Sequence, residues 1–137
     1  MIPINLKKKL NEISKKNSDL IPVVSIHPYR KDALESLNRW GKMGVKVVKW
    51  LPNKMGMDPS DHRFEEFYLT MKKYNMTLLT HTGSESSMSV NFDHLGNPLL
   101  LKYPLDLGVK VIAAHCASLG KGVDLESKDQ QKVDNFT

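Results

Sequence analysis

The chain has 137 residues, of which 40% are hydrophobic and 26% charged, as expected for one folded domain over residues 1–137. A single cysteine, Cys116, excludes an internal disulfide and a multi-cysteine zinc site. The longest apolar runs are too short to cross a membrane, and the lysine-rich start of the chain lacks the apolar stretch of a signal peptide. We therefore expect a cytoplasmic protein with no membrane partner.

The net charge of +5 raises the question of nucleic-acid binding. Much of the basic excess lies in the first 20 residues, where lysines alternate at helical spacing with Leu6, Leu10 and Ile13. This pattern is typical of a solvated helix face opposite a buried one. The sequence contains no zinc finger, no aromatic RNA-binding strand motif and no arginine-rich recognition helix, so we expect no nucleic-acid partner.

The predicted elements alternate between helices and strands, with apolar spacing as the main signal. In chain order, the sequence predicts a helix over about 4–16, a strand at 22–26, a helix over 31–43, a strand at 45–51, a loop to about residue 60, a helix over 61–74, a strand at 76–81, a loop over 84–93, a helix near 98–107 and a strand at 109–115. The core is expected over about residues 5–125. A polar tail covers 121–137, with one helix beginning near Ser127.

Strands that alternate with helices predict an α/β fold with a parallel sheet in sequence order. Two architectures fit, a doubly wound sheet and part of a TIM-type (β/α)8 barrel. No G-x-G-x-x-G motif follows the first strand, which weakens the doubly wound alternative. At or just past the ends of the four strands lie His27, Lys49, His81 and His115. Barrels build their active sites at that rim, so the pattern favours a partial barrel with about four parallel strands and flanking helices.

His81 and His115 are the leading site candidates. Strand alternation places His81 on one face with Leu79, and His115 on one face with Ala113, and we expect both faces to form the barrel interior. Two imidazoles from adjacent strands would then point into one pocket, as metal ligands do. The alternative is that they are unrelated strand-end histidines, each hydrogen-bonded within its own loop.

Three further residues have two interpretations each. Lys49 shares a face with Val47, where it is either paired, modified or ligand-bound, or extends its ammonium to solvent. Glu85, in the loop after His81, is either a substrate-binding residue of the same pocket or a solvated loop acid. Alternation turns Cys116 away from the interior, which favours a buried structural thiol over a nucleophile.

Four segments together resemble the amidohydrolase superfamily, in particular its amidohydrolase-related metal-dependent hydrolases. They are HP at 27–28, GVKVVKWLP at 44–52, LLTHTG at 78–83 and VIAAHCASLG at 111–120. The resemblance covers about residues 5–125 and corresponds to the third to sixth βα units of that family's barrel. It therefore implies the central part of a TIM-type barrel.

The resemblance also implies a role for each candidate. His81 matches the fifth-strand metal ligand, and His115 matches the sixth-strand histidine that is a ligand or a catalytic group. Lys49 stands on the fourth strand, where two-metal members carry a carboxylated lysine. The family hydrolyses C–N or C–O bonds of small organic substrates, or decarboxylates them, with a metal-activated water. Zinc is the expected metal, with manganese or iron as alternatives.

Two parts of the family pattern are absent from the sequence. It contains neither the H-x-H pair of the first strand nor the aspartate of the eighth strand, and a complete barrel takes about 250 residues. We expect a fragment of the parent hydrolase that is inactive alone. One alternative is a non-catalytic half-barrel that assembles with a partner or with itself through open sheet edges. The third hypothesis is a doubly wound binding domain.

Overall fold

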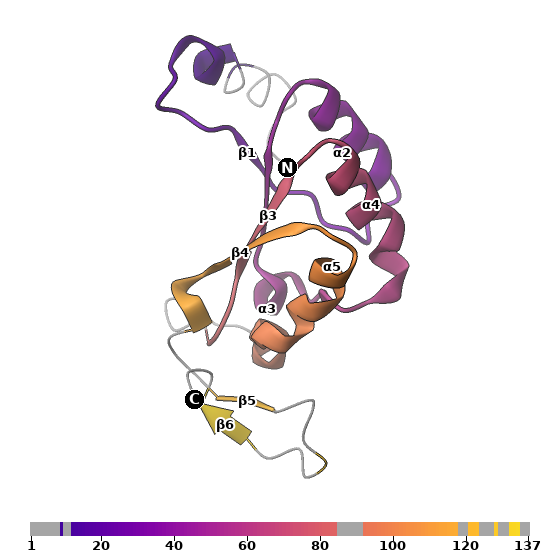
Figure 1. Ribbon diagram of the computed structural model, residues 1–137, viewed down its shortest axis with the longest axis vertical. Coiled ribbons are helices and arrows are strands. Elements are labelled where there is room, and N and C mark those ends of the chain that lie inside the picture. Colours follow the sequence, from indigo (N-terminus) through magenta and orange to yellow (C-terminus); the bar gives the residue numbers. More distant parts are fainter. Residues whose placement is uncertain are drawn as a thin grey trace.

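The structure, a computed structural model, describes residues 9, 12–84, 92–117, 121–123, 128 and 132–134. Its centre is a four-stranded parallel sheet in the order β1-β2-β3-β4 (Figure 1). The strands are β1 (Val23–Val24), β2 (Val47–Trp50), β3 (Thr77–His81) and β4 (Lys110–Ala114). The predicted parallel α/β sheet in sequence order is therefore confirmed, although β1 is shorter than expected.

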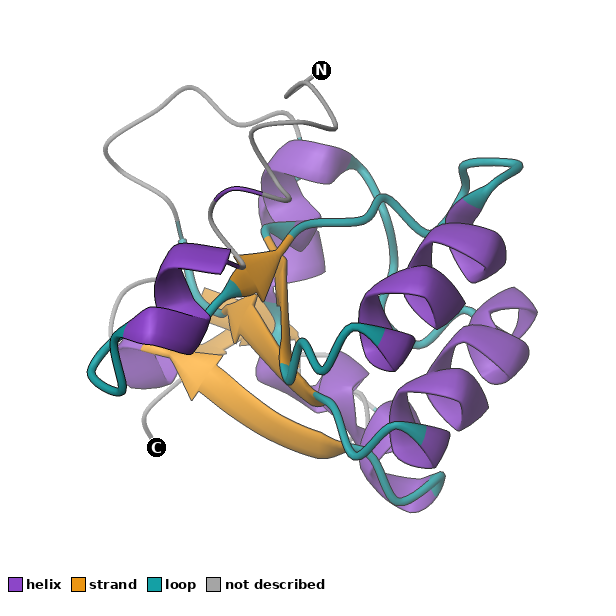
Figure 2. Cartoon of the chain, turned by 90° about the horizontal axis from the view of Figure 1, so that it is seen from above, coloured by secondary structure: helices purple, strands orange, loops and turns teal. Residues whose placement is uncertain are grey.

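Three helices, α2 (Ala33–Lys42), α4 (Glu65–Lys73) and α5 (Lys102–Asp106), lie on the same side of the sheet (Figure 1). Helices α2 and α4 run side by side (Figure 2). Residues 12–16 are also helical. No helix in the described part of the chain is long and apolar enough to cross a membrane.

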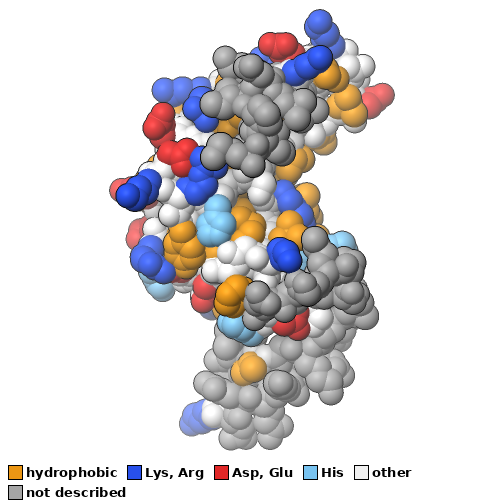
Figure 3. Space-filling model, turned by 180° about the vertical axis from the view of Figure 1, so that it is seen from behind, with side chains coloured by type: hydrophobic (Ala, Val, Ile, Leu, Met, Phe, Trp, Pro, Cys, Tyr) orange, Lys and Arg blue, Asp and Glu red, His pale blue; other side chains and the backbone are white. Residues whose placement is uncertain are grey.

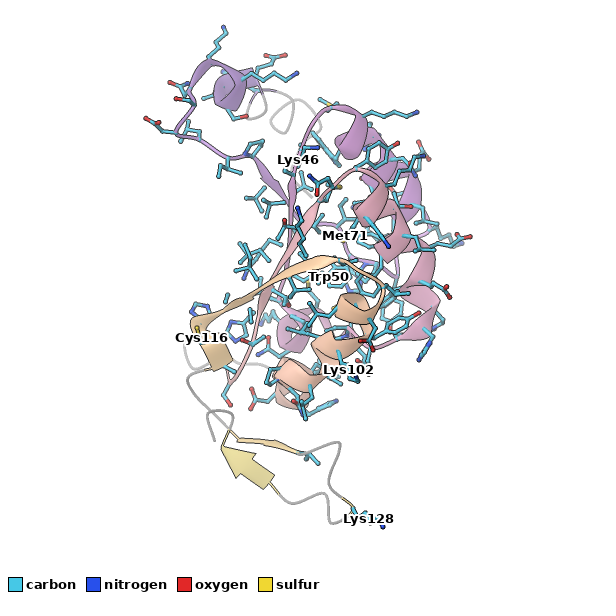
Figure 4. All side chains as sticks on the ribbon, viewed as in Figure 1. Lys46, Trp50, Met71, Lys102, Cys116 and Lys128 are labelled. Atoms are coloured by element: carbon cyan, nitrogen blue, oxygen red, sulfur yellow. The ribbon has the colours of Figure 1, made fainter. Side chains whose placement is uncertain are left out.

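Strand alternation divides the sheet into a packed face and an open face. On the packed face, Val48 and Trp50 of β2 are fully buried against the helices. The Trp50 ring lies 5.4 Å from Phe67 and 5.8 Å from Tyr68 between centroids, and its indole N–H donates to the carbonyl of Ile26 at 2.8 Å. Trp50 and Met71 both lie between the sheet and the helices in Figure 4. This packing holds the helices against one face only.

The open face points away from α2, α4 and α5. By register and alternation it carries Val23, Val47, Lys49, Thr77, Leu79, His81 and Ile112. Val23 on β1 is 48% exposed and Ile112 on β4 is 52% exposed. Hydrophobic side chains are visible among histidines and basic groups on the molecular surface in Figure 3. The strands thus carry more apolar side chains than the described helices cover.

Two local expectations were wrong. The segment after β2 was predicted as a loop but begins with a short helix, α3 (Pro52–Met55). Proline suits the first turn of a helix, and Gly56 ends this one at a φ of 65°.

In the tail, strand β6 (Lys132–Asp134) pairs antiparallel with β5 (Lys121–Val123). The helix expected to begin near Ser127 therefore does not include residues 132–134, and Ser127 itself lies outside the described residues.

Candidate functional site

His81 ends β3 at the carboxyl edge of the sheet. Its side chain is buried, with 5% exposed, and it lies on the open face, two residues beyond Leu79. Ring atom Nε2 lies 3.2 Å from the carbonyl oxygen of Gly83. Because a carbonyl only accepts, Nε2 donates in this contact, and the neutral imidazole then has its lone pair on Nδ1. Nδ1 is therefore the atom that could bind a metal.

The His115 ring lies beside that of His81, with ring centroids 5.0 Å apart and planes at 57°. The structure thus brings the two predicted histidines together, although His115 is exposed. The reason differs from the one expected. Register places Ala113 level with Thr80, on the packed face, so alternation alone would direct His115 toward the helices and away from His81.

A left-handed turn redirects His115. Strand β4 ends at Ala114, and the next three residues, His115, Cys116 and Ala117, have φ angles of 64°, 51° and 53°. Non-glycine residues pay roughly 1–2 kcal/mol each for this conformation. Such a turn needs interactions from elsewhere in the structure to hold it.

Thr82 supplies those interactions from the neighbouring strand end. Its side chain is buried, and its hydroxyl donates to the carbonyl of Ala114 at 2.8 Å and accepts from the amide of Ala117 at 3.0 Å. One side chain thereby spans the turn that carries His115, directly beside His81. The sequence did not predict this role, since the hydrogen-bond partners of Thr82 lie 32 and 35 residues away along the chain.

The turn after His81 is anchored from two more elements. The fully buried Asn53 of α3 donates from Nδ2 to the Gly83 carbonyl at 3.4 Å, and its Oδ1 has no hydrogen-bond partner within the described structure. The Gly83 amide donates to the carbonyl of Gly96 at 2.8 Å. A Cβ at Gly96 would lie 2.4 Å from the Gly83 oxygen, so only glycine fits there. Asn53 was also missed, because its segment was predicted as a loop.

The remaining candidates have different outcomes. Lys49 lies on the open face like His81, level with Leu79 on the adjacent strand. It is half-buried, and burial lowers the pKa of its ammonium from the usual lysine value. Glu85 lies outside the described residues. The expectation of a buried Cys116 was wrong, because the left-handed turn exposes this thiol.

The described residues fit a metal only in part. They contain no group of three or more His, Cys, Asp or Glu side chains placed to hold an ion. An open catalytic zinc site takes about three protein ligands and leaves one position for water. His81 and His115 provide two imidazoles, which are suitable zinc ligands, and the amide oxygen of Asn53 is an unpaired buried acceptor close to the same turn. The pair amounts to an incomplete site.

Comparison with known proteins adds no information about the role of these residues. No family model, no curated protein and no solved structure matches the chain. An assignment of function therefore depends on the sequence motifs and on the geometry at the ends of β3 and β4.

Proposed function

We propose that this chain forms half of a TIM-type (β/α)8 barrel belonging to an amidohydrolase-like, metal-dependent hydrolase. The proposed reaction is hydrolysis of a C–N or C–O bond in a small organic substrate, with decarboxylation as the alternative. The observation that carries this proposal is the 5.0 Å separation of the His81 and His115 rings. They extend from the ends of adjacent parallel strands, at the edge where barrels assemble their active sites.

The arrangement of the layers supports the barrel part of the proposal. Strands follow one another in sequence order, and α2, α4 and α5 share one face. In a barrel these helices form the outer ring, and the open face becomes the interior. Lys49 and His81 both lie on that face.

Each candidate residue then has a defined task. His81 and His115 would bind zinc, or alternatively manganese or iron, and the bound metal would supply hydroxide at neutral pH by lowering the pKa of its water. Because His115 is exposed, its ring is also accessible to a substrate. Burial favours the neutral amine of Lys49, the form that reacts with carbon dioxide when a lysine is carboxylated. Glu85, in the loop after His81, would bind the substrate.

Zinc titration of the purified chain by calorimetry tests the site. We expect one weak site, with a Kd of roughly 1–100 µM for a two-imidazole centre, and at least a tenfold loss of affinity in both His81→Ala and His115→Ala. His62→Ala is the matched control, because the His62 ring stacks on Tyr103 at 4.3 Å and takes no part in the pair. Unchanged zinc affinity in the double variant His81→Ala/His115→Ala would exclude this site.

One observation favours a second candidate, a non-catalytic half-barrel that assembles with another chain. The exposed apolar side chains of Val23 and Ile112 lie on the two edge strands, where a partner would bind. Metal binding separates the two functions, because the chain alone is expected to be inactive as a hydrolase. Zinc or manganese binding that requires His81 supports the hydrolase, whereas association without metal binding at His81 supports the assembly module.

A further inference from the structure

Asn53 is a polar residue in a fully buried position of α3. Its Nδ2 donates to the Gly83 carbonyl oxygen at 3.4 Å, whereas its Oδ1 is buried and has no hydrogen-bond partner within the described structure. A buried acceptor without a partner is costly, so an apolar side chain of similar shape, such as leucine, would be at least as favourable for stability at this position. Folding alone therefore does not explain an asparagine here.

The Gly83 oxygen is an acceptor that Asn53 shares with a candidate metal ligand. Nε2 of His81 lies 3.2 Å from the same oxygen. A carbonyl oxygen has two lone pairs and can accept both bonds. The side chain of α3 and the side chain at the end of β3 thus meet at one backbone atom.

The direction of this carbonyl depends on its contacts, because Gly83 itself imposes little. Gly83 has a φ of 85°, and glycine has more backbone freedom than any other residue. Its amide donates to the Gly96 carbonyl at 2.8 Å, which fixes the amide but not the Gly83 oxygen. Asn53, in contrast, is placed by a short helix that begins at Pro52 and ends at Gly56. It therefore offers a fixed donor to a carbonyl that could otherwise rotate.

We propose that Asn53 is a positioning residue for His81 and acts through the Gly83 carbonyl. By holding that oxygen toward Nε2, Asn53 keeps the proton of the neutral imidazole on Nε2, so that Nδ1 is the nitrogen presented to a metal. Metal-bound histidines are commonly oriented in this way, by donation from the other ring nitrogen to a backbone carbonyl. The inference rests on the proposed function for the role of Nδ1, but the tautomer itself is measured without metal.

Nitrogen-15 NMR of the metal-free chain tests the proposal, at a pH well above the usual histidine pKa so that the rings are neutral. The signals of the two ring nitrogens report which of them carries the proton. We expect His81 of the unmodified chain to have its proton mainly on Nε2, and His81 of Asn53→Leu to be a mixture of both tautomers. The urea midpoint of Asn53→Leu should not be lowered. A proton mainly on Nδ1 of His81 in the unmodified chain would overturn the proposal.

Asn38→Leu is the matched control. Asn38 of α2 uses both halves of its amide, because it donates to the Leu34 carbonyl at 2.9 Å and accepts from the Tyr74 hydroxyl at 3.0 Å. We expect Asn38→Leu to lower the urea midpoint and to leave the His81 tautomer unchanged, the reverse of Asn53→Leu. Asn53→Ala, which also lacks the donor and adds no bulk, should give the same tautomer mixture as Asn53→Leu. A folded Asn53 variant with the His81 tautomer of the unmodified chain would overturn the proposal.

Zinc titration of the same chains separates this inference from the proposed metal site. We expect Asn53→Leu to bind zinc roughly tenfold more weakly than the unmodified chain, and Asn38→Leu to bind it equally well. If the unmodified chain binds no zinc, the proposed metal site fails, and the tautomer comparison still decides whether Asn53 positions His81. If zinc binds but Asn53→Leu changes neither the affinity nor the tautomer, the positioning role alone fails.

Discussion

The ends of β3 and β4 each present a histidine, but they hold it in different ways. His81 belongs to a regular strand and is buried, whereas the exposed His115 stands in a left-handed turn after its strand has ended. Regular pairing positions the first, and long-range hydrogen bonds from Thr82 position the second. Two neighbouring side chains can therefore be held differently, one by a regular strand and the other by hydrogen bonds from an adjacent segment.

The largest expected effect comes from disturbing the anchor of the β3 end. In Gly96→Ala, the new methyl group would lie 2.4 Å from the Gly83 oxygen, so the backbone must shift. We expect a loss of about 3 kcal/mol in the free energy of unfolding, measured in urea. Gly44→Ala is the comparison, because Gly44 has a φ of 87° and no heavy atom near its Cβ position, and it should lose only about 1 kcal/mol. Equal losses would show that the contact between Gly83 and Gly96 is unimportant.

Thr82→Val tests the link between the two ends. It keeps the shape of the side chain but removes both hydrogen bonds to the turn, leaving the buried Ala117 amide unpaired. We expect a loss of about 2 kcal/mol and a change in the NMR signals of the His115 ring larger than in those of His81. Thr77→Val is the control, since Thr77 begins β3, at the opposite end of the strand from the turn. Unaltered His115 signals in Thr82→Val would show that the two Thr82 hydrogen bonds do not position His115.

Cys116→Gly should stabilise the chain, in contrast to the two preceding substitutions. Glycine adopts a φ of 51° without steric cost, and the exposed thiol contributes no core packing. We expect a gain of about 0.5–1 kcal/mol in thermal unfolding experiments. Cys116→Ala, which keeps a Cβ, should leave stability within about 0.5 kcal/mol of the unmodified chain. Destabilisation by glycine would mean that the turn is not strained.

The smallest effect concerns Lys49, on the strand beside His81. Burial lowers the pKa of Lys49, so in the pH interval between its folded value and the unfolded value near 10.5 the unfolded chain binds more protons. The contribution of Lys49 to stability therefore rises with pH through that interval and is least favourable below it. Because Lys49 is only half-buried and solvent screens its charge, we expect Lys49→Met to stabilise the chain at pH 7 by under about 0.5 kcal/mol, with less gain at pH 10.

The urea midpoint at the two pH values measures this difference. Lys46→Met serves as the control, because the Lys46 ammonium is exposed and donates to the Tyr74 carbonyl at 2.8 Å. An equal gain for Lys49→Met at both pH values would indicate that packing, and not charge burial, is responsible.

Most of the sheet could be predicted from local patterns. The β-branched run at 45–51 and the run at 76–81 are too short and too apolar for surface helices, and each follows a segment with helical spacing. The tail and the segment after β2 were predicted incorrectly, since their structure depends on weak signals, such as Pro52 at a helix start and the pairing of β5 with β6.

The sequence by itself determined the order and direction of the strands, because apolar periodicity acts within each segment and sequential βα units pair as parallel neighbours. It also identified His81 and His115 as strand-end residues. Only the tertiary structure decided that their rings meet. That contact depends on a turn held by Thr82, which bonds to Ala114 and Ala117 across separations of 32 and 35 residues. No local pattern encodes such a bond, since its partners become neighbours only after the strands have paired.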